Sequence, residues 1–176
     1  MRRSLLYPAV SLLLTAMLVV PGCQNVPTEP LTQQEENIHL IQASAKALGL
    51  AKGVRVGKWI SSEEGGTLGG AATFNNYVQI PPGALEKDMF LTLSIDITRA
   101  GALVFSITGR GVPRGEHIYF EDGKVSTLVV NGEWLARVPE LAVNIDTGEQ
   151  FAVQHAGSTF MAALPHFSRY GWCWLP

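Results

Sequence analysis

The sequence predicts a mainly β protein: an antiparallel β-sandwich that follows an N-terminal leader, a short tether and one amphipathic helix. From Val54 onward, short runs of β-branched and aromatic residues alternate with glycine, proline, asparagine and aspartate, which is typical of all-β domains. Turn sequences such as Asn131-Gly132 and the stretch 146–148 separate neighbouring runs. Hairpins are the simplest connection across such turns, so the strands are expected to pair antiparallel.

Residues 1–22 have the layout of a secretory signal peptide. Arg2 and Arg3 form a short basic stretch, and the apolar segment 4–20 that follows carries no charge. The length of this segment is near the lower limit for a membrane-spanning helix, so an uncleaved anchor is one alternative and an ordinary secretory signal is another. We expect residues 1–22 to be removed from the mature protein.

A cysteine stands directly after the expected cleavage site. Val20, Gly22 and Cys23 resemble the lipobox of bacterial lipoproteins, in which the cysteine thiol carries a diacylglyceryl group and becomes the N-terminus after cleavage. Pro21 departs from that pattern, because alanine, serine or threonine is usual there. The resemblance implies a protein held on a membrane by acyl chains, whose buried methylenes contribute about 0.8 kcal/mol each. Gln24, in place of the aspartate that retains lipoproteins in the inner membrane, favours the outer membrane of a Gram-negative host.

Length and charge limit the function classes. The part after the leader, 23–176, suits one domain with a single core. The chain has 13 Lys and Arg against 15 Asp and Glu, a formal charge of −2, so it offers no electrostatic footprint for nucleic acid. Once Cys23 is acylated, Cys173 is the remaining thiol, and no disulfide framework is predicted.

Residues 23–53 are expected to form the lipidated tether and a short helix. The polar, proline-bearing start suits a spacer between an anchor and a folded body. Thr32 and Glu35 form a capping-box pattern, and apolar residues at helical spacing predict a helix over 33–48. Its narrow apolar stripe is expected to dock on the β domain, with docking on a partner as the alternative. The stripe consists of Ile38, Ile41, Ala45 and Leu48.

Residues 54–176 are expected to form the β domain. Within the run that starts at Leu91, apolar residues alternate with polar ones, so one face of that strand should pack and the other should meet water. The predicted strands are Val54–Ile60, Asn76–Ile80, Phe90–Ile97, Ala102–Ile107, His117–Phe120, Lys124–Val130, Glu140–Ile145, Gln150–Gln154, Phe160–Leu164 and Ser168–Trp174.

Three motifs occur in order within this region. They are Glu-Gly-Gly-Thr-Leu at 64–68, Val-Gln-Ile-Pro-Pro-Gly-Ala-Leu at 78–85 and His-Phe-Ser-Arg-Tyr at 166–170. Together they resemble a ZU-five domain, the β-sandwich module of ankyrins and netrin receptors, which has similar domains in bacterial lipoproteins. The resemblance covers about 54–174, although the segment 109–115 lacks the pattern of the family's central strands. Because the eukaryotic modules bind proteins, it implies an unidentified envelope protein as partner and no small-molecule substrate.

His166, Phe167 and Ser168 are the candidate catalytic residues, since some relatives cut themselves between the Phe and Ser of this tripeptide. In that chemistry the serine hydroxyl attacks the preceding carbonyl, the histidine takes the proton, and backbone strain lowers the barrier to an ester that water hydrolyses. The alternative is structural: His166 caps a polar edge, Phe167 fills the core and Ser168 begins the last strand.

Other side chains give weaker signals. The remaining histidines lie neither at His-x-x-x-His spacing nor beside a cysteine pair, so no metal and no cofactor is predicted. Asp146 could complete a hydrolytic triad with His166 and Ser168, but the Gly-x-Ser-x-Gly elbow is missing. The remaining histidines are His39, His117 and His155.

Tyr170, Trp172 and Trp174 alternate along the last predicted strand. Side chains of this size usually belong to the core, and a ligand-stacking face is the alternative. The sequence as a whole predicts a membrane-anchored cell-envelope lipoprotein whose β domain is a non-catalytic protein-interaction or structural module. The alternative function is a self-processing domain that cleaves its own Phe167–Ser168 bond.

Overall fold

The computed structural model describes residues 39–48, 53–113 and 116–175. The leader, Cys23, most of the tether and the first part of the predicted helix, 33–38, lie outside the described residues. No helix in these three described ranges is both long and apolar enough to cross a bilayer.

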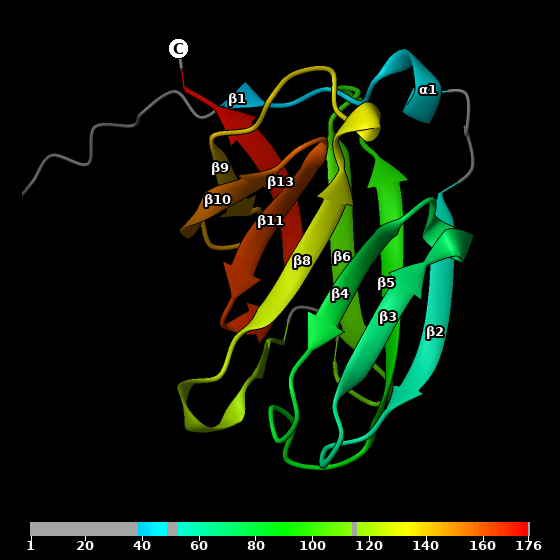
Figure 1. The fold of residues 1–176 in the computed structure, drawn as a ribbon, viewed down its shortest axis with the longest axis vertical. Helices are drawn as coiled ribbons and strands as arrows, with labels where there is room; N and C mark the ends of the chain where they lie inside the picture. The colour runs from blue at the N-terminus through cyan, green and yellow to red at the C-terminus, as the bar shows by residue number, and fades with distance from the viewer. Residues whose placement is uncertain (1–38, 49–52, 114–115, 176) are drawn as a thin grey trace, which may run out of the picture. The chain divides into compact units, whose positions relative to one another are not determined.

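The strands form one continuous antiparallel sheet (Figure 1). From neighbour to hydrogen-bonded neighbour, its order is β2-β5-β6-β13-β9-β10-β11-β8-β4-β3, and β1 adds to β13. A separate pair joins β7 to β12. The strands are β1 (His39–Leu40), β2 (Val54–Ile60), β3 (Gly66–Gly70), β4 (Asn76–Ile80), β5 (Met89–Ile97), β6 (Leu103–Gly109), β7 (Ile118–Tyr119), β8 (Ser126–Asn131), β9 (Leu141–Asn144), β10 (Gln150–Ala156), β11 (Thr159–Leu164), β12 (His166–Phe167) and β13 (Arg169–Trp174). The helical turns are α1 (Ala45–Leu48), η1 (Ala71–Thr73), η2 (Glu121–Gly123) and η3 (Gly132–Trp134).

The two ends of this strand order, β2 and β3, lie side by side, so the sheet is nearly closed and barrel-like (Figure 1). An isolated bridge joins Ser61 to Gly65 in the turn between them, and Lys58 Nζ donates to the Thr67 carbonyl across the gap at 3.4 Å. The prediction of a mainly β, antiparallel fold is confirmed. A sandwich of two separate sheets is not confirmed, because the hydrogen-bonded path is continuous.

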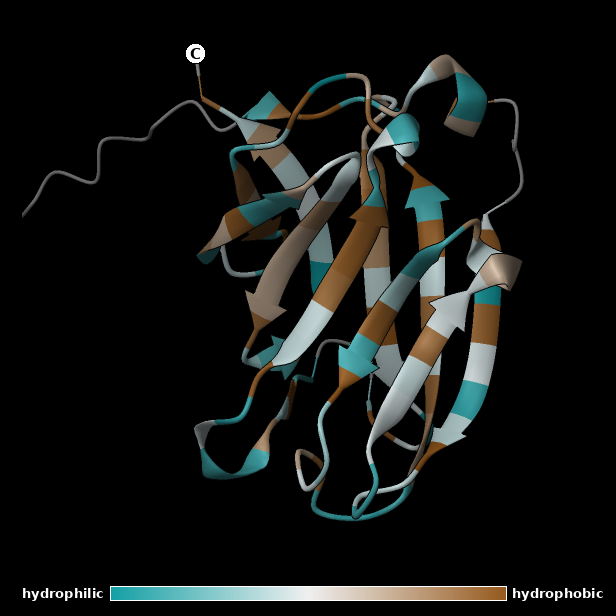
Figure 2. Cartoon of the chain, viewed as in Figure 1, coloured by the Kyte–Doolittle hydropathy of each residue, from teal (hydrophilic) through white to brown (hydrophobic). Residues whose placement is uncertain are grey.

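Apolar side chains from both halves of the sheet meet in one core. Successive side chains of a strand point to opposite faces of the sheet, so alternating hydrophobic and hydrophilic residues, visible along the strands in Figure 2, place the hydrophobic ones in the core. On β5, Leu91, Leu93 and Ile95 are buried whereas Asp96 is exposed, as the sequence predicts. The largest fully buried side chains are Trp172, Tyr170, Phe105 and Phe167.

All ten predicted strands are observed, and their ends differ from the prediction by no more than two residues. β3 was not predicted, because three of its five residues are glycine and Thr67 is its single β-branched residue. At Gly69, φ is 112°, and an added Cβ would lie 2.5 Å from the Asn76 carbonyl oxygen. Glycine therefore lets β3 approach its partner β4 closely.

The predicted helix over 33–48 is wrong for most of its described part. His39 and Leu40 form strand β1 opposite Trp174 and Cys173, and the helix is limited to α1. The Ile41 amide donates to the Trp172 carbonyl at 2.7 Å. Backbone pairing with β13 therefore outweighs the local helical pattern, since apolar residues spaced along a short segment can be buried from either conformation.

The sequence predicts that the three aromatic side chains of β13 belong to the core, and two of them are fully buried. Tyr170 and Trp172 are fully buried, and Trp174 is partly buried. Trp174 stacks on His39 with ring centroids 5.1 Å apart and lies under the Arg137 guanidinium at 4.5 Å. The core interpretation therefore holds for the first two residues.

We expect Trp172→Ala to lower the free energy of unfolding by about 3–5 kcal/mol, because truncating a fully buried tryptophan leaves a cavity. Trp59→Ala is the matched control, since Trp59 is 62% exposed and its loss should cost less than about 1 kcal/mol. Urea unfolding of the full-length protein in detergent, followed by far-UV circular dichroism, measures both. Equal losses in the two variants would contradict the central position of β13.

Candidate site around residues 166–170

The segment 166–170 runs from β12 into β13, with a bend at Ser168. The hairpin turn between β9 and β10, 145–149, lies against it. Asn144 fixes this turn: its Oδ1 accepts from the Asp146 amide at 2.9 Å, and its carbonyl accepts from the Gly148 amide at 2.8 Å. The turn therefore places two carboxylates, those of Asp146 and Glu149, against the segment, and each contacts different side chains there.

The first carboxylate, that of Glu149, contacts a buried histidine. His166 is 3% exposed, and its Nε2 lies 2.9 Å from Glu149 Oε2. Its Nδ1 lies 3.2 Å from Nδ1 of His117 and 3.0 Å from the Tyr170 hydroxyl. A carboxylate only accepts hydrogen bonds, so the neutral His166 ring carries its proton on Nε2 and a lone pair on Nδ1.

Tyr170 holds the backbone of this cluster in place. Its hydroxyl donates to the His166 carbonyl at 2.5 Å. Burial raises the pKa of Tyr170 well above its usual value, with a further contribution from the charge of Glu149. The phenol therefore keeps its proton and acts as a donor.

The second carboxylate, that of Asp146, contacts the following two residues. The Ser168 hydroxyl donates to Asp146 Oδ2 at 3.0 Å. Arg169 donates through Nε to both oxygens at 3.0 and 3.1 Å, and through Nη2 to Oδ1. Hydrogen bonding from Arg169 is the largest cause that lowers the pKa of Asp146, and the same bond raises the pKa of Arg169.

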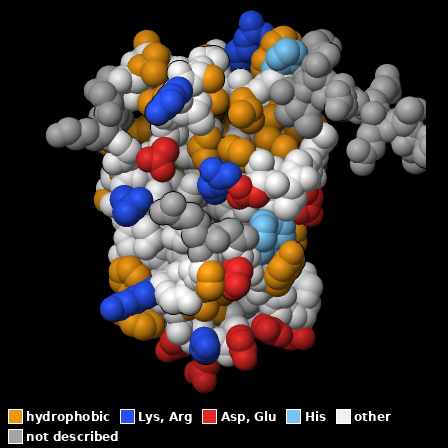
Figure 3. Space-filling model, turned by 180° about the vertical axis from the view of Figure 1, so that it is seen from behind, with side chains coloured by type: hydrophobic (Ala, Val, Ile, Leu, Met, Phe, Trp, Pro, Cys, Tyr) orange, Lys and Arg blue, Asp and Glu red, His pale blue; other side chains and the backbone are white. Residues whose placement is uncertain are grey.

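Asp146, Ser168 and Arg169 border a groove of about 690 Å³ on the outer face of the sheet, which we call the polar groove although apolar residues, including Val112 and Ile118, also line it. Hydroxyl side chains of β5 and β6 form its floor, and charged groups of both signs flank it. Figure 3 shows acidic and basic side chains next to each other on the face turned away from the viewer of Figure 1. The polar lining includes Arg55, Thr92, Ser94, Asp96, Ser106, Thr108, Asp146, Ser168 and Arg169.

His166 and Ser168 lie two residues apart in this segment, but their side chains do not form the hydrogen bond that self-cleavage would use. No hydrogen bond joins the Ser168 hydroxyl to the His166 imidazole in the described residues, since each has other partners. Asp146, whose pKa is lowered, is a weak base for that hydroxyl. Non-glycine residues with positive φ are Phe74, Asn75 and Asp122, so this form of strain is not found at the Phe167–Ser168 bond.

The alternative that these residues are purely structural fits Phe167, which was expected in the core, better than His166, which was expected at a polar edge. Phe167 is buried and meets Phe120 edge-on with ring centroids 4.6 Å apart. His166 is not at a polar edge but inside, where Glu149 and His117 satisfy it. The triad arrangement is not formed either, because Asp146 contacts Ser168 directly and has no hydrogen bond to His166 among the described residues.

Neither Glu149 nor the pairing of His117 with His166 was predicted from the sequence. Glu149 follows a recognisable turn, but the partner of a turn side chain depends on which strand lies beside it. Among the described residues, no three side chains of His, Cys, Asp and Glu come together as metal ligands. Cys173 is buried, and burial raises its pKa to about 11, so its thiol is unreactive near neutral pH.

Comparisons of the chain with protein-family models, with curated proteins and with solved structures found no match.

We expect Asp146→Asn to lower the free energy of unfolding by about 0.5–1 kcal/mol at pH 7, the range for a partly exposed ion pair. The pKa of Asp146 is below its usual 3.8 in the folded protein, so the carboxylate stabilises the fold at neutral pH and this contribution is lost as the pH falls through that lowered pKa. The difference from wild type should therefore shrink at about pH 2.5.

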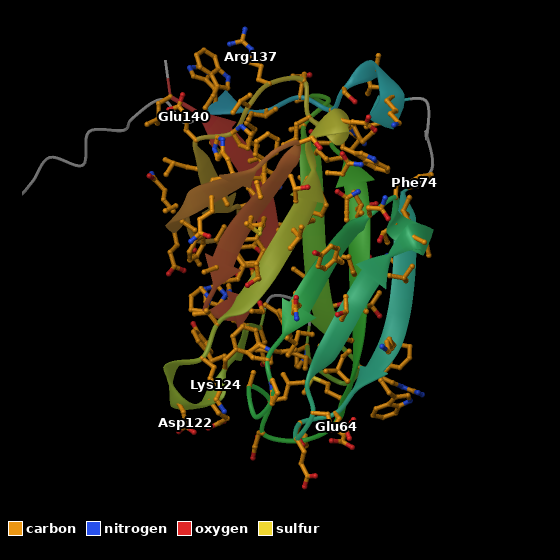
Figure 4. All side chains as sticks on the ribbon, viewed as in Figure 1. Glu64, Phe74, Asp122, Lys124, Arg137 and Glu140 are labelled. Carbon is orange, nitrogen blue, oxygen red and sulfur yellow. The ribbon has the colours of Figure 1, made fainter. Side chains whose placement is uncertain are left out.

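Asp122→Asn is the control, because Asp122 lies in an exposed turn before β8 (Figure 4). It should have little effect at either pH. A loss for Asp146→Asn that is the same at both pH values would show that its cause is not the charge.

Proposed function

We propose that this chain is a cell-envelope lipoprotein, held on a membrane through lipid on Cys23, whose β domain is a non-catalytic protein-interaction or structural module. One observation supports the lipid anchor: Arg2 and Arg3 are followed by an uncharged apolar segment, and Gly22 then stands directly before Cys23. Two or three acyl chains bind a bilayer far more durably than one. Gln24 favours the outer membrane if the host is Gram-negative.

We assign the β domain to a ZU-five-like sandwich. The motifs at 64–68, 78–85 and 166–170 support this assignment. The sheet also has two halves that β10 connects: Gln150–Ala152 pair with β9, and Val153–Ala156 pair with β11. A strand that changes sheets in this way is a known means of joining the layers of a sandwich.

The polar groove supports the interaction role. Its floor offers hydroxyl groups, including Thr108 on β6, and its rim offers both cations and anions, such as Arg55 and Asp96. A polar polypeptide segment suits this groove, because its backbone can hydrogen-bond to the hydroxyl groups and its charged side chains can pair with the cations and anions. The groove is therefore assigned to an envelope protein partner.

Self-cleavage at Phe167–Ser168 is the alternative, and the geometry gives it less support. The Ser168 hydroxyl donates to Asp146, and attack on the preceding carbonyl would need a base that can take its proton. This alternative is tested together with the anchor.

We expect the denatured intact mass of the protein from bacterial membranes to correspond to residues 23–176 plus acyl groups. Cys23→Ala should remove the acyl mass, because the thiol is the attachment point. Ser168→Ala should leave the mass unchanged apart from the substitution. An unacylated wild-type mass would contradict the anchor, and loss of residues 168–176 that Ser168→Ala prevents would make this a self-cutting domain.

We expect in situ cross-linking to recover the same partner with wild type and with Thr67→Trp, and to lose it with Thr108→Trp. Thr108 is exposed and lines the groove, so a tryptophan there would fill it. Thr67 is exposed on β3, outside the groove. If no reproducible partner is recovered with wild type, or if both variants lose it equally, the groove is not the interaction site.

A further inference from the structure

Two histidines from different parts of the chain face each other beside the candidate site. Nδ1 of His117, which precedes β7, lies 3.2 Å from Nδ1 of His166 on β12. The two rings are nearly perpendicular, at 83°, with centroids 4.8 Å apart. β7 and β12 pair with each other, and this pairing holds the two rings together.

Nδ1 of His166 carries a lone pair, and it lies 3.2 Å from His117 Nδ1 and 3.0 Å from the Tyr170 hydroxyl. Glu149 accepts from Nε2 at 2.9 Å, and the Tyr170 hydroxyl has its proton directed to the His166 carbonyl at 2.5 Å. A carboxylate on the far nitrogen of an imidazole is the usual partner of a metal-ligating histidine, because it fixes the tautomer and makes the ligating nitrogen more basic.

The distances between the two rings are compatible with a common ligand. In a linear N–H···N bond each ring centre would lie roughly 1.1 Å behind its nitrogen, so the centroids would be about 5.4 Å apart. The observed 4.8 Å means that the two ring axes are not collinear with the line that joins the nitrogens. Two imidazole nitrogens at about 2.0–2.1 Å from a tetrahedral ion lie about 3.3 Å apart, close to the observed 3.2 Å.

We propose that His117 and His166 bind one divalent transition-metal ion, Zn²⁺ or Cu²⁺, through their Nδ1 atoms. Imidazole is a favoured ligand of both ions. His117 is partly exposed, so an ion can enter from solvent and water completes its coordination. Binding requires only that neutral His117 carry its proton on Nε2.

The ion would link the segment before β7 to β12. Glu116 and Ile118, on either side of His117, line the polar groove. A bound ion would therefore hold one wall of the groove against the strand that carries His166.

The test is isothermal titration of ZnCl₂, and separately of CuCl₂, into full-length protein purified in detergent without a histidine tag and freed of metal. We expect wild type and His155→Asn to bind one ion with the same affinity, because His155 lies on β10 with its Nε2 against the Pro139 carbonyl. His117→Asn should weaken binding at least about tenfold, and Glu149→Gln by about 10–100-fold through its partner histidine.

A second measurement does not depend on any variant folding. In the ¹H–¹⁵N imidazole spectrum of wild type, Zn²⁺ should shift Nδ1 of His117 and His166 and leave His39 and His155 in place. Absence of one-site binding for both ions, equal weakening by His117→Asn and His155→Asn, or equal shifts of all four histidines would overturn the proposal.

Discussion

The fold depends on the backbone pairing of its last strand, β13, in the middle of the sheet. β13 pairs with β6 through Arg169–Gly171, with β9 through Tyr170–Cys173, and with β1 through its final two residues. The earlier strands β2, β5 and β6 are thereby joined to the hairpin of β9 and β10, which comes later in the chain. The side chains that β13 buries, Tyr170 and Trp172, occupy the centre of the core.

This pairing also explains why the segment 166–170 is so well defined. Paired strands flank this segment, so its side chains can adopt few positions. The β9–β10 turn lies beside it, and two carboxylates of that turn contact its side chains. Glu149 meets the buried histidine, whereas Asp146 meets Ser168 and Arg169 at the groove. One short turn thus supports a buried polar cluster and an exposed ion pair, and the two have different electrostatic surroundings.

Much of the fold could be predicted from sequence, and the candidate site could not. Strands such as β5 were predictable because alternation and turn residues are local properties. β1 was not, because the pairing of His39–Leu40 depends on where β13 leaves backbone groups unpaired. The same holds for the site: His166 and Ser168 were found as a motif, but the partners Glu149 and His117 come from segments that only the sheet order brings close.

The central position of β13 has a consequence for the order of events in synthesis. β6 cannot be joined to β9 through the sheet until residues 169–174 have left the ribosome. The fold therefore contains many contacts between distant parts of the chain, and such contacts slow folding. Before residues 169–174 are made, β6 and β9 each expose an edge of unpaired backbone groups, which is a template for pairing with the edge strand of another chain.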